Sequence, residues 1–322
     1  MDTRGILIHP EELTDNIIAL LKKSKLNVLG LHPVGGATSD KSLANLLELI
    51  KTNDFQGKLQ RVREMGISIE YELHALSWLL PREMYHTHPE WFRMNEEGQR
   101  VNDYNMCPSN QEALDYIQVR AAELATVLKS DSGRYYFWLD DVNHTFCNCK
   151  KCRSLSKSDQ ALVIYNAILK GIRSVEPNAK QCFLAYQETM VPPVTVKPAE
   201  GIFLEYAPIW RNTYVPMFDK NDEKNVEYCA MIEPLLAYFG KEDSQTLEYW
   251  LDNSLFSNWE KPPKPITICE DTIRKDIQFY RQCGFQHITT FGCYLSDDYI
   301  DLYGIPPIEE YGTCFSKIRH DE

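Results

Sequence analysis

The residues best suited to chemistry are two adjacent carboxylates, Asp140 and Asp141, which follow the bulky apolar run Tyr135–Leu139. Neighbouring carboxylates in different surroundings hold different pKa values, so that one stays ionised while the other stays protonated near neutral pH. Hydrolysis of a glycosidic bond needs this division, with one group that protonates the leaving oxygen and a second that stabilises or attacks the anomeric carbon. The pair therefore predicts a glycosidase centre. The alternative is a pair that only caps the next loop or helix.

Three cysteines, Cys147, Cys149 and Cys152, follow the acidic pair in the pattern Cys-x-Cys-x-x-Cys. Thiols this close together suit a tetrahedral metal site, with Cys107 or His144 as the fourth ligand. Four sulfur ligands favour zinc over an iron–sulfur cluster, and a filled shell of four ligands makes the zinc structural. The alternative is a set of unpaired redox-active thiols.

The start of the chain indicates a reducing compartment for these thiols. Met1–Pro10 lacks the basic and apolar stretches of a signal peptide, and no apolar run approaches the ~18 residues that span a bilayer. We therefore expect a cytoplasmic protein without membrane association, where disulfides are rare. The six remaining cysteines are dispersed, and most are expected to be buried free thiols: Cys182, Cys229, Cys269, Cys283, Cys293 and Cys314.

Eight short apolar runs alternate with amphipathic stretches along the 322 residues. The runs are Gly5–Pro10, Asn27–His32, Ser68–Leu76, Arg134–Asp141, Gln181–Glu188, Gly201–Ile209, Thr246–Asp252 and His287–Tyr294. The helical patterns cover Thr14–Lys25, Ser42–Met65, Gln111–Lys129, Asp159–Val175, Asn225–Phe239 and Thr272–Cys283. This alternation predicts an α/β fold, a single (β/α)₈ TIM barrel over residues 1–322. The alternative is an open doubly wound sheet, but no Gly-rich phosphate turn follows the first run.

Polar and aromatic residues end nearly every run, and the active site of such a barrel lies at the carboxyl ends of its strands. The residues expected to bind substrate there are His32, Glu72, His74, Tyr186, Gln187, Glu205, Tyr206, Trp210, Trp250 and Asp252. His9 and Glu188 also end their runs. Alternation puts Glu248 on one face with Trp250 and Asp252, and that face points either into the barrel or toward the helices.

The net charge of −12 and the scattered Lys and Arg residues argue against a nucleic-acid binder, which usually has a basic face. Aromatic residues make up 11% of the chain. Aromatic faces serve both as stacking platforms for sugars and as core filling. The partner expected from the acidic pair is a carbohydrate substrate, and the sequence predicts no oligomeric state.

The stretch His88-Pro-Glu-Trp-Phe92, followed by Gly98 and Cys107, precedes the acidic pair and the cysteine pattern. Together these motifs resemble a poorly characterised family of glycosidase-like barrels, a domain of unknown function common in polysaccharide-degrading bacteria. The similarity runs through most of the chain, and its specific motifs lie between His88 and Cys152. The resemblance implies a barrel fold and glycosidase activity.

The cysteines also resemble those of the zinc-containing β-galactosidases, which carry one Cys on the third-strand loop and Cys-x-Cys-x-x-Cys after the fourth-strand acid. The matching residues are Cys107, Cys147, Cys149 and Cys152. This resemblance implies a structural zinc. Those enzymes have an Asn-Glu pair where this chain has Asp140-Asp141, so their retaining mechanism does not carry over directly.

The acidic pair itself resembles that of the O-GlcNAcase type of β-N-acetylhexosaminidase. In that family the first Asp orients the acetamido group of the substrate, which attacks the anomeric carbon, and the second Asp is the general acid/base. The resemblance gives Asp140 the first role and Asp141 the second, in substrate-assisted hydrolysis.

Three other functions are open on the sequence. A conventional retaining glycosidase, similar to a β-galactosidase, would use Asp141 as acid/base and Glu248 or Asp252 as nucleophile. A metal-dependent sugar isomerase or epimerase would need a second, catalytic metal. Its candidate ligands are His32, Glu72, His74, Glu188 and Glu205. A non-catalytic sugar-binding barrel would share the fold without the chemistry.

Overall fold

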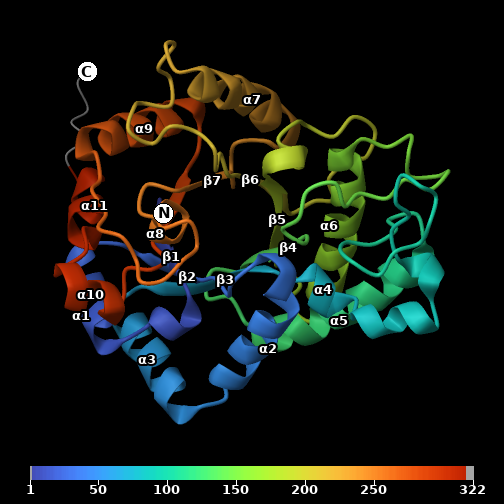
Figure 1. The fold of residues 1–322 in the computed structure, drawn as a ribbon, viewed down its shortest axis with the longest axis horizontal. Helices are drawn as coiled ribbons and strands as arrows, with labels where there is room; N and C mark the ends of the chain where they lie inside the picture. The colour runs from blue at the N-terminus through green and yellow to red at the C-terminus, as the bar shows by residue number, and fades with distance from the viewer. Residues whose placement is uncertain (1, 317–322) are drawn as a thin grey trace. The chain divides into compact units, whose positions relative to one another are not determined.

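A computed structural model describes residues 2–316, and its eight strands form one closed barrel in chain order (Figure 1). The strands are β1 (Thr3–Ile8), β2 (Val28–Leu31), β3 (Ser68–His74), β4 (Arg134–Trp138), β5 (Lys180–Ala185), β6 (Ile202–Tyr206), β7 (Gln245–Glu248) and β8 (His287–Phe291). Neighbouring strands run parallel, with β1 paired to both β2 and β8. The predicted α/β class and (β/α)₈ TIM barrel are therefore confirmed.

Helices connect the strands except between β5 and β6, where the described chain has only the 3-10 turn Gln187–Thr189, and two further helices follow β8. They are α1 (Asp15–Ser24), α2 (Ser39–Leu49), α3 (Asn53–Glu64), α4 (Leu76–Leu79), α5 (Gln111–Val127), α6 (Lys157–Arg173), α7 (Glu223–Phe239), α8 (Asn253–Phe256), α9 (Glu270–Cys283), α10 (Asp297–Tyr303) and α11 (Ile308–Cys314). Within residues 2–316, no helix is both long enough and apolar enough to cross a membrane.

One predicted helix, Ser42–Met65, is two helices in the structure, α2 and α3. The break falls before Thr52, whose hydroxyl accepts a hydrogen bond from the amide of Phe55 and so caps α3. An N-cap threonine satisfies a free amide of the first turn, which favours a new helix start over a continued helix. Thr14 caps α1 in the same way, because its hydroxyl accepts the amide of Ile17.

The strands are buried on both faces, because side chains fill the barrel interior and helices cover the outside. Tyr136 of β4 contacts Phe203 of β6, with ring centroids 5.6 Å apart. Since β5 lies between these strands, this contact crosses the interior of the barrel. On the outer side, Phe183 of β5 packs against Tyr165 of α6.

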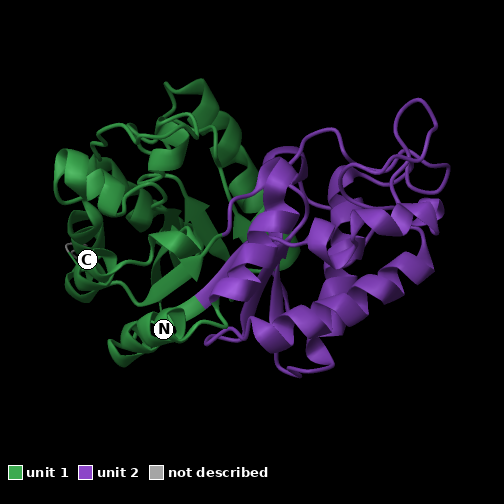
Figure 2. Ribbon diagram, turned by 60° about the horizontal axis from the view of Figure 1, so that its bottom comes forward, with its two compact units in different colours: residues 1–32, 50–69, 205–322 green, residues 33–49, 70–204 purple. Residues whose placement is uncertain are grey.

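The chain divides into two compact units, coloured separately in Figure 2. Unit 1 comprises residues 1–32, 50–69 and 205–322, and it contains β1, β2, β7 and β8. Unit 2 comprises residues 33–49 and 70–204, and it contains β4 and β5 with the long helices α5 and α6. The acidic pair and all four clustered cysteines belong to unit 2.

Candidate active site

The two carboxylates that follow β4 lie in different surroundings. The side chain of Asp140 is 0% exposed. Its Oδ1 accepts the backbone N–H of Ser77 at 3.0 Å, and its Oδ2 accepts the backbone N–H of Asn105 at 2.6 Å. The guanidinium of Arg82 lies 3.9 Å from the same Oδ2. Asp140 therefore holds helix α4 and the loop of Asn105 against the end of β4, as in the loop-capping alternative, and offers no exposed carboxylate oxygen to a sugar.

Asp141 is half-buried and lines a pocket in unit 2. The pocket encloses about 410 Å³, including solvent at its mouth. Its polar and aromatic lining consists of His74, Asn105, Asp140, Asp141, Asn143, Phe146, Tyr165, Tyr186, Gln187, Glu188 and Thr189. A carboxylate at the rim of a small polar pocket is well placed to exchange a proton with a bound molecule.

His74, at the end of β3, lies beside Asp141. Its Nδ1 is 2.6 Å from the carbonyl oxygen of Leu139, and because a carbonyl only accepts, Nδ1 carries the hydrogen. In the neutral ring Nε2 is then the acceptor. A Cβ at Gly35 would lie 2.7 Å from Cδ2 of His74 and 3.5 Å from Oδ2 of Asp141. Glycine at position 35 thus leaves room for this imidazole next to the carboxylate.

The rim of the pocket contains strained backbone. Asn105, His144 and Gln187 have φ values of 54°, 60° and 45°, in the left-handed region that residues other than glycine rarely adopt. The side chain of Asn143 bonds to Gln187, and the amide of His144 donates to Glu188 at 2.7 Å. Strain of this kind is concentrated at functional sites, where the surroundings hold it in place.

Three of the ten residues predicted to bind substrate, His74, Tyr186 and Gln187, line this pocket with Asp141. Glu72 lies in β3 and is completely buried. The other six belong to unit 1.

In β6, Glu205 and Tyr206 point to opposite faces, as alternation requires. Glu205 accepts a hydrogen bond from Gln245 of β7 at 3.1 Å. The ring of Tyr206 packs against Tyr280 of α9 at 6.4 Å and against Phe285. Tyr206 therefore lies between the sheet and a helix, which corrects its predicted role in substrate binding.

Glu248 and Trp250 face helix α9. Both carboxylate oxygens of Glu248 accept Nε of Arg211, at 2.9 and 3.0 Å, and the indole N–H of Trp250 donates to Asp276 at 3.3 Å. Glu248 and Arg211 are 0% exposed, and burial raises the pKa of Glu248. The face expected to point either inward or outward thus points toward α9 at these positions. That placement corrects two predictions, namely that Glu248 is a nucleophile and that Trp250 contacts a sugar.

Asp252 and His32 are also held by their neighbours. Asp252 caps α8 by accepting the hydroxyl of Ser254 at 2.5 Å and the amide of Leu255 at 3.3 Å, and burial raises its pKa. The carbonyl of His32 accepts Nδ1 of His9 at 2.7 Å, and the two rings stack at 5.8 Å. Trp210, by contrast, is 49% exposed.

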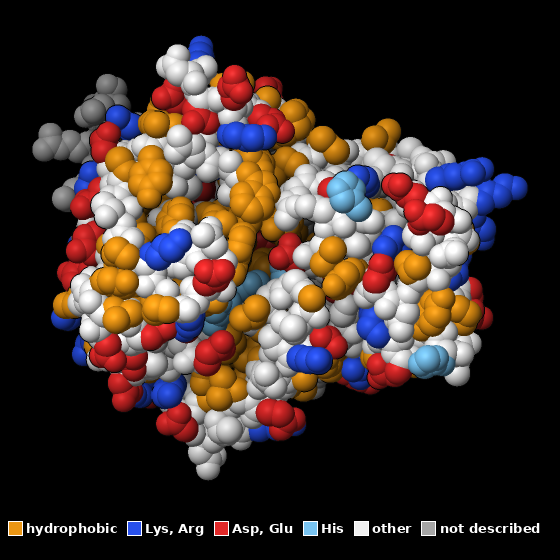
Figure 3. All heavy atoms as spheres, in the orientation of Figure 1, with side chains coloured by type: hydrophobic (Ala, Val, Ile, Leu, Met, Phe, Trp, Pro, Cys, Tyr) orange, Lys and Arg blue, Asp and Glu red, His pale blue; other side chains and the backbone are white. Residues whose placement is uncertain are grey.

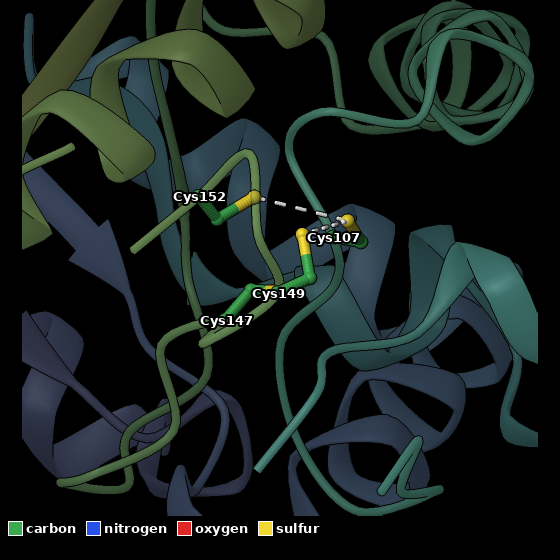
Figure 4. Close-up of side chains that lie close together, drawn as sticks. All are labelled: Cys107, Cys147, Cys149 and Cys152. Atoms are coloured by element: carbon green, nitrogen blue, oxygen red, sulfur yellow. Dashed lines mark hydrogen bonds between the residues drawn. The ribbon is translucent and has the colours of Figure 1, made fainter. Parts of the chain in front are cut away.

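The four predicted cysteine ligands meet in unit 2 (Figure 4). Cys107 comes from the loop after β3, and its Sγ lies 3.8 Å from Sγ of both Cys149 and Cys152. The Sγ atoms of these three and of Cys147 all lie within 4.8 Å of one another. A tetrahedron with Zn–S bonds of about 2.3 Å has edges of about 3.8 Å, so the spacing fits one zinc ion.

The surroundings of the cluster suit thiolates. The amide of Met94 donates to Sγ of Cys147 at 3.3 Å, and Arg100 approaches the same sulfur at 3.8 Å. Hydrogen bonds from Cys147 and Cys152 lower the pKa of Cys107. His144, the other candidate ligand, is 83% exposed in its side chain and pairs with Glu188 instead.

Among residues 2–316, one further group of side chains could hold a metal: His88, Glu90 and Glu112, on the surface. The five residues that an isomerase would use as metal ligands belong to neither of these two groups. Ten free cysteines are present, and of the six dispersed ones Cys182, Cys293 and Cys314 are buried while the others are half-buried.

Sequence reasoning missed Gly35, Asn105 and Trp259. Gly35 stands in a Gly-Gly pair that begins three residues after the end of the second run, and Asn105 precedes Cys107 by two residues. Trp259 stands in the polar, proline-rich segment after the seventh run, where a solvent-facing tryptophan is unusual. These features are visible in the sequence, but the residues that Gly35, Asn105 and Trp259 contact are seen only in the fold.

Solved structures similar to this chain are barrel enzymes that act on carbohydrates. A glycoside hydrolase family 5 enzyme from Prevotella bryantii B14, solved with a xyloglucan tetradecasaccharide, is 8% identical with a TM-score of 0.50, over 95% of this chain and 86% of that one. An exo-β-1,4-mannosidase from Opitutaceae bacterium strain TAV5 is 12% identical with a TM-score of 0.52, over 98% of this chain and 60% of that one. A β-galactosidase from the psychrophilic Marinomonas ef1 is 11% identical with a TM-score of 0.50, over 90% of this chain and 54% of that one. At these identities the likeness establishes the fold.

No curated protein matches the sequence. A family model described as a domain of unknown function (DUF4838) matches residues 49–296, more than half of the chain.

Proposed function

We propose that this chain, which belongs to the family described as a domain of unknown function (DUF4838), is a glycoside hydrolase that acts on a carbohydrate substrate. The observation that carries the proposal is the position of Asp141, a half-buried carboxylate at the carboxyl end of β4 in a pocket with His74. Active sites of such barrels lie at this end of the strands. The barrel fold shared with three carbohydrate-active enzymes is in keeping with it.

In the proposed reaction Asp141 is the general acid/base. Its carboxylic acid gives a proton to the glycosidic oxygen as the bond from that oxygen to the anomeric carbon breaks. Water then adds to the anomeric carbon, and its proton returns to Asp141. His74, next to Asp141, would contact the sugar through Nε2, because Nδ1 is bound to Leu139.

Asp140 is a positioning residue in this proposal. Two backbone amides, those of Ser77 and Asn105, occupy its carboxylate, which disfavours the acetamido-orienting role. A β-N-acetylhexosaminidase with substrate-assisted catalysis is the finer form of the proposal, and it needs another group to orient the acetamido. Inhibition by a thiazoline analogue of the acetamido intermediate supports that form. Hydrolysis without such inhibition supports a protein nucleophile.

We propose further that Cys107, Cys147, Cys149 and Cys152 bind a structural zinc ion. Support comes from the sulfur-to-sulfur distance of 3.8 Å from Cys107 to both Cys149 and Cys152, which is the edge of a tetrahedron around a single ion, and from the placing of all four sulfurs within 4.8 Å of one another. An iron–sulfur cluster contains several metal atoms and would need the sulfurs farther apart. The ion would hold the Cys107 loop to the segment after the acidic pair, and four sulfur ligands leave no position for substrate.

The experiment is a panel of aryl glycosides: β-N-acetylglucosaminide, β-N-acetylgalactosaminide, galactosides and glucuronides. Release of the aryl group from one of them, with kcat/KM about 10²–10⁴-fold lower in Asp141→Asn, supports the proposal. The loss should be smaller on a dinitrophenyl glycoside, whose leaving oxygen needs no proton. Asp115→Asn, an exposed aspartate on α5, is the matched control. Hydrolysis that is unchanged in Asp141→Asn on an unactivated substrate contradicts the role.

A further inference from the structure

Two tryptophans of unit 1 expose their indoles on the segments that follow β6 and β7. Trp210 is 49% exposed and Trp259 is 56% exposed. Their ring centroids lie 6.5 Å apart at an angle of 81°, an edge-to-face contact. Indoles have large apolar faces, so paired indoles left in water indicate a surface that binds something.

A buried ion network holds Trp210 in place. The next residue, Arg211, is completely buried and contacts both Glu248 of β7 and Asp276 of α9. Its Nη1 also donates to the carbonyl of Asn212 at 3.1 Å. Because the guanidinium has charged partners in two elements, the backbone that carries Trp210 is fixed before any ligand arrives.

The backbone of Trp259 is strained and braced. Asn258 and Trp259 have φ values of 57° and 56°, in the left-handed region, which residues other than glycine rarely adopt. The amide of Trp259 donates to the carbonyl of Ser254 at 2.7 Å, and its carbonyl accepts the hydroxyl of Tyr294 at 3.4 Å. Strained backbone is concentrated at functional sites, so the strain at Trp259 indicates that the orientation of its exposed indole has a function.

A second aromatic pair joins the same two segments. Tyr214 is 59% exposed, and its ring lies 6.4 Å from that of Phe256. The aromatic surface therefore extends beyond a single pair. On the face drawn in Figure 3, acidic and basic side chains are interspersed with hydrophobic ones. With a net charge of −12, such a protein favours a neutral ligand over a polyanion.

We propose that Trp210 and Trp259 form a stacking site for a pyranose ring of a neutral polysaccharide. One face of a pyranose presents C–H groups, which pack on an indole while the hydroxyls at the ring edge stay in water. Both tryptophans follow the carboxyl ends of strands, the end where barrel enzymes bind substrates. This inference rests on the proposed function, since it assumes a carbohydrate substrate.

The test is native gel electrophoresis in gels that contain xyloglucan, galactomannan or glycol chitin. The natural chain should be retarded by at least one polymer. Trp210→Ala and Trp259→Ala should bind that polymer about tenfold more weakly. Trp259→Phe, which keeps an aromatic face, should restore part of the retardation. Tyr303→Ala, at an exposed aromatic of α10, is the matched control and should bind normally.

Retardation that is equal in the natural chain and both alanine variants overturns the site, as does a natural chain that no polymer retards. Circular dichroism of each variant separates loss of binding from loss of fold. Failure of the proposed function is distinguishable, because Asp141→Asn should still be retarded. In the same way, Trp259→Ala should raise KM more on longer substrates than on an aryl monosaccharide, whereas Tyr303→Ala should change neither KM.

Discussion

Asn105 and Asp140 are hydrogen-bonded in both directions. The amide of Asn105 donates to Oδ2 of Asp140 at 2.6 Å, and the amide of Asp140 donates to Oδ1 of Asn105 at 3.2 Å. The side-chain nitrogen of Asn105 also donates to the hydroxyl of Thr145 at 2.7 Å. Asn105 precedes Cys107 by two residues and Thr145 precedes Cys147 by two. The same bonds therefore connect the end of β4 to both halves of the cysteine cluster.

Asp140→Ala should lower the free energy of unfolding by about 2–4 kcal/mol, because two backbone amides lose a charged, buried acceptor. Asp141→Asn, next to it but half-buried in the pocket, should change the free energy by less than about 0.5 kcal/mol. Urea unfolding followed by circular dichroism measures both. Equal stability of the two variants would show that Asp140 does not hold these loops.

The purified chain should contain about one zinc ion per molecule by elemental analysis. Cys147→Ser removes one ligand and should lose most of the zinc and lower the unfolding temperature. Cys229→Ser changes a half-buried thiol outside the cluster and is the control. Stoichiometric iron in place of zinc, or the same zinc content in Cys147→Ser and the control, would refute the site.

Gly35→Ala should impair activity more than stability. The new methyl group would lie 2.7 Å from Cδ2 of His74, so the imidazole must shift from its present position. Displacement of a group next to the reacting carboxylate should lower kcat/KM about tenfold or more on the substrate that the aryl glycoside panel identifies. Gly57→Ala is the control, because a methyl there meets no atom within 4 Å. If both variants kept full activity, His74 would not depend on the space at Gly35.

Stability should fall as the pH rises from about 5 to about 8, in part because of Glu12. Burial raises the pKa of Glu12 to about 8 from its ordinary value of 4.5. The fold therefore favours the protonated acid, and this contribution is present below pH 4.5 and is lost as the pH rises toward 8.

Through Glu12, the free energy of unfolding should fall by at most about 1.4 kcal/mol for each pH unit. Glu12→Gln cannot ionise, so its free energy of unfolding should vary less over this interval than that of the natural chain. Urea unfolding at several pH values compares it with Glu11→Gln, an exposed neighbour. Parallel pH profiles for all three proteins would mean that Glu12 is already ionised in the fold.

The barrel was predictable because eight apolar runs alternate with helical patterns, and each run overlaps a strand. Which side of a strand faces inward was not predictable at β7. A strand buried on both faces has no apolar-polar alternation to mark the interior. Glu248 is tolerated on the outer face because it is bonded to Arg211, in the β6–α7 segment, and to Tyr280 of α9, both of which are distant in the sequence.

At the candidate site, the spacing of Cys147, Cys149 and Cys152 was enough to predict that these three meet, whereas Cys107, on another loop, had His144 as an alternative. The adjacent aspartates are equivalent in the sequence, and only the amides of Ser77 and Asn105 distinguish them. The aromatic pair of Trp210 and Trp259 depends on two segments that the sequence does not connect. Short-range patterns thus predict ligands that share a loop, while the division of roles depends on tertiary contacts.

The closure of the barrel by its first two strands has a practical consequence for expression. The family match begins at residue 49, after β1 and β2, yet β1 pairs with β8 and completes the ring. A protein cut to residues 49–296 would leave the edge of β8 with a row of unpaired amides and carbonyls. Such edges recruit strands from other molecules, so this fragment should aggregate, whatever the state of its catalytic residues.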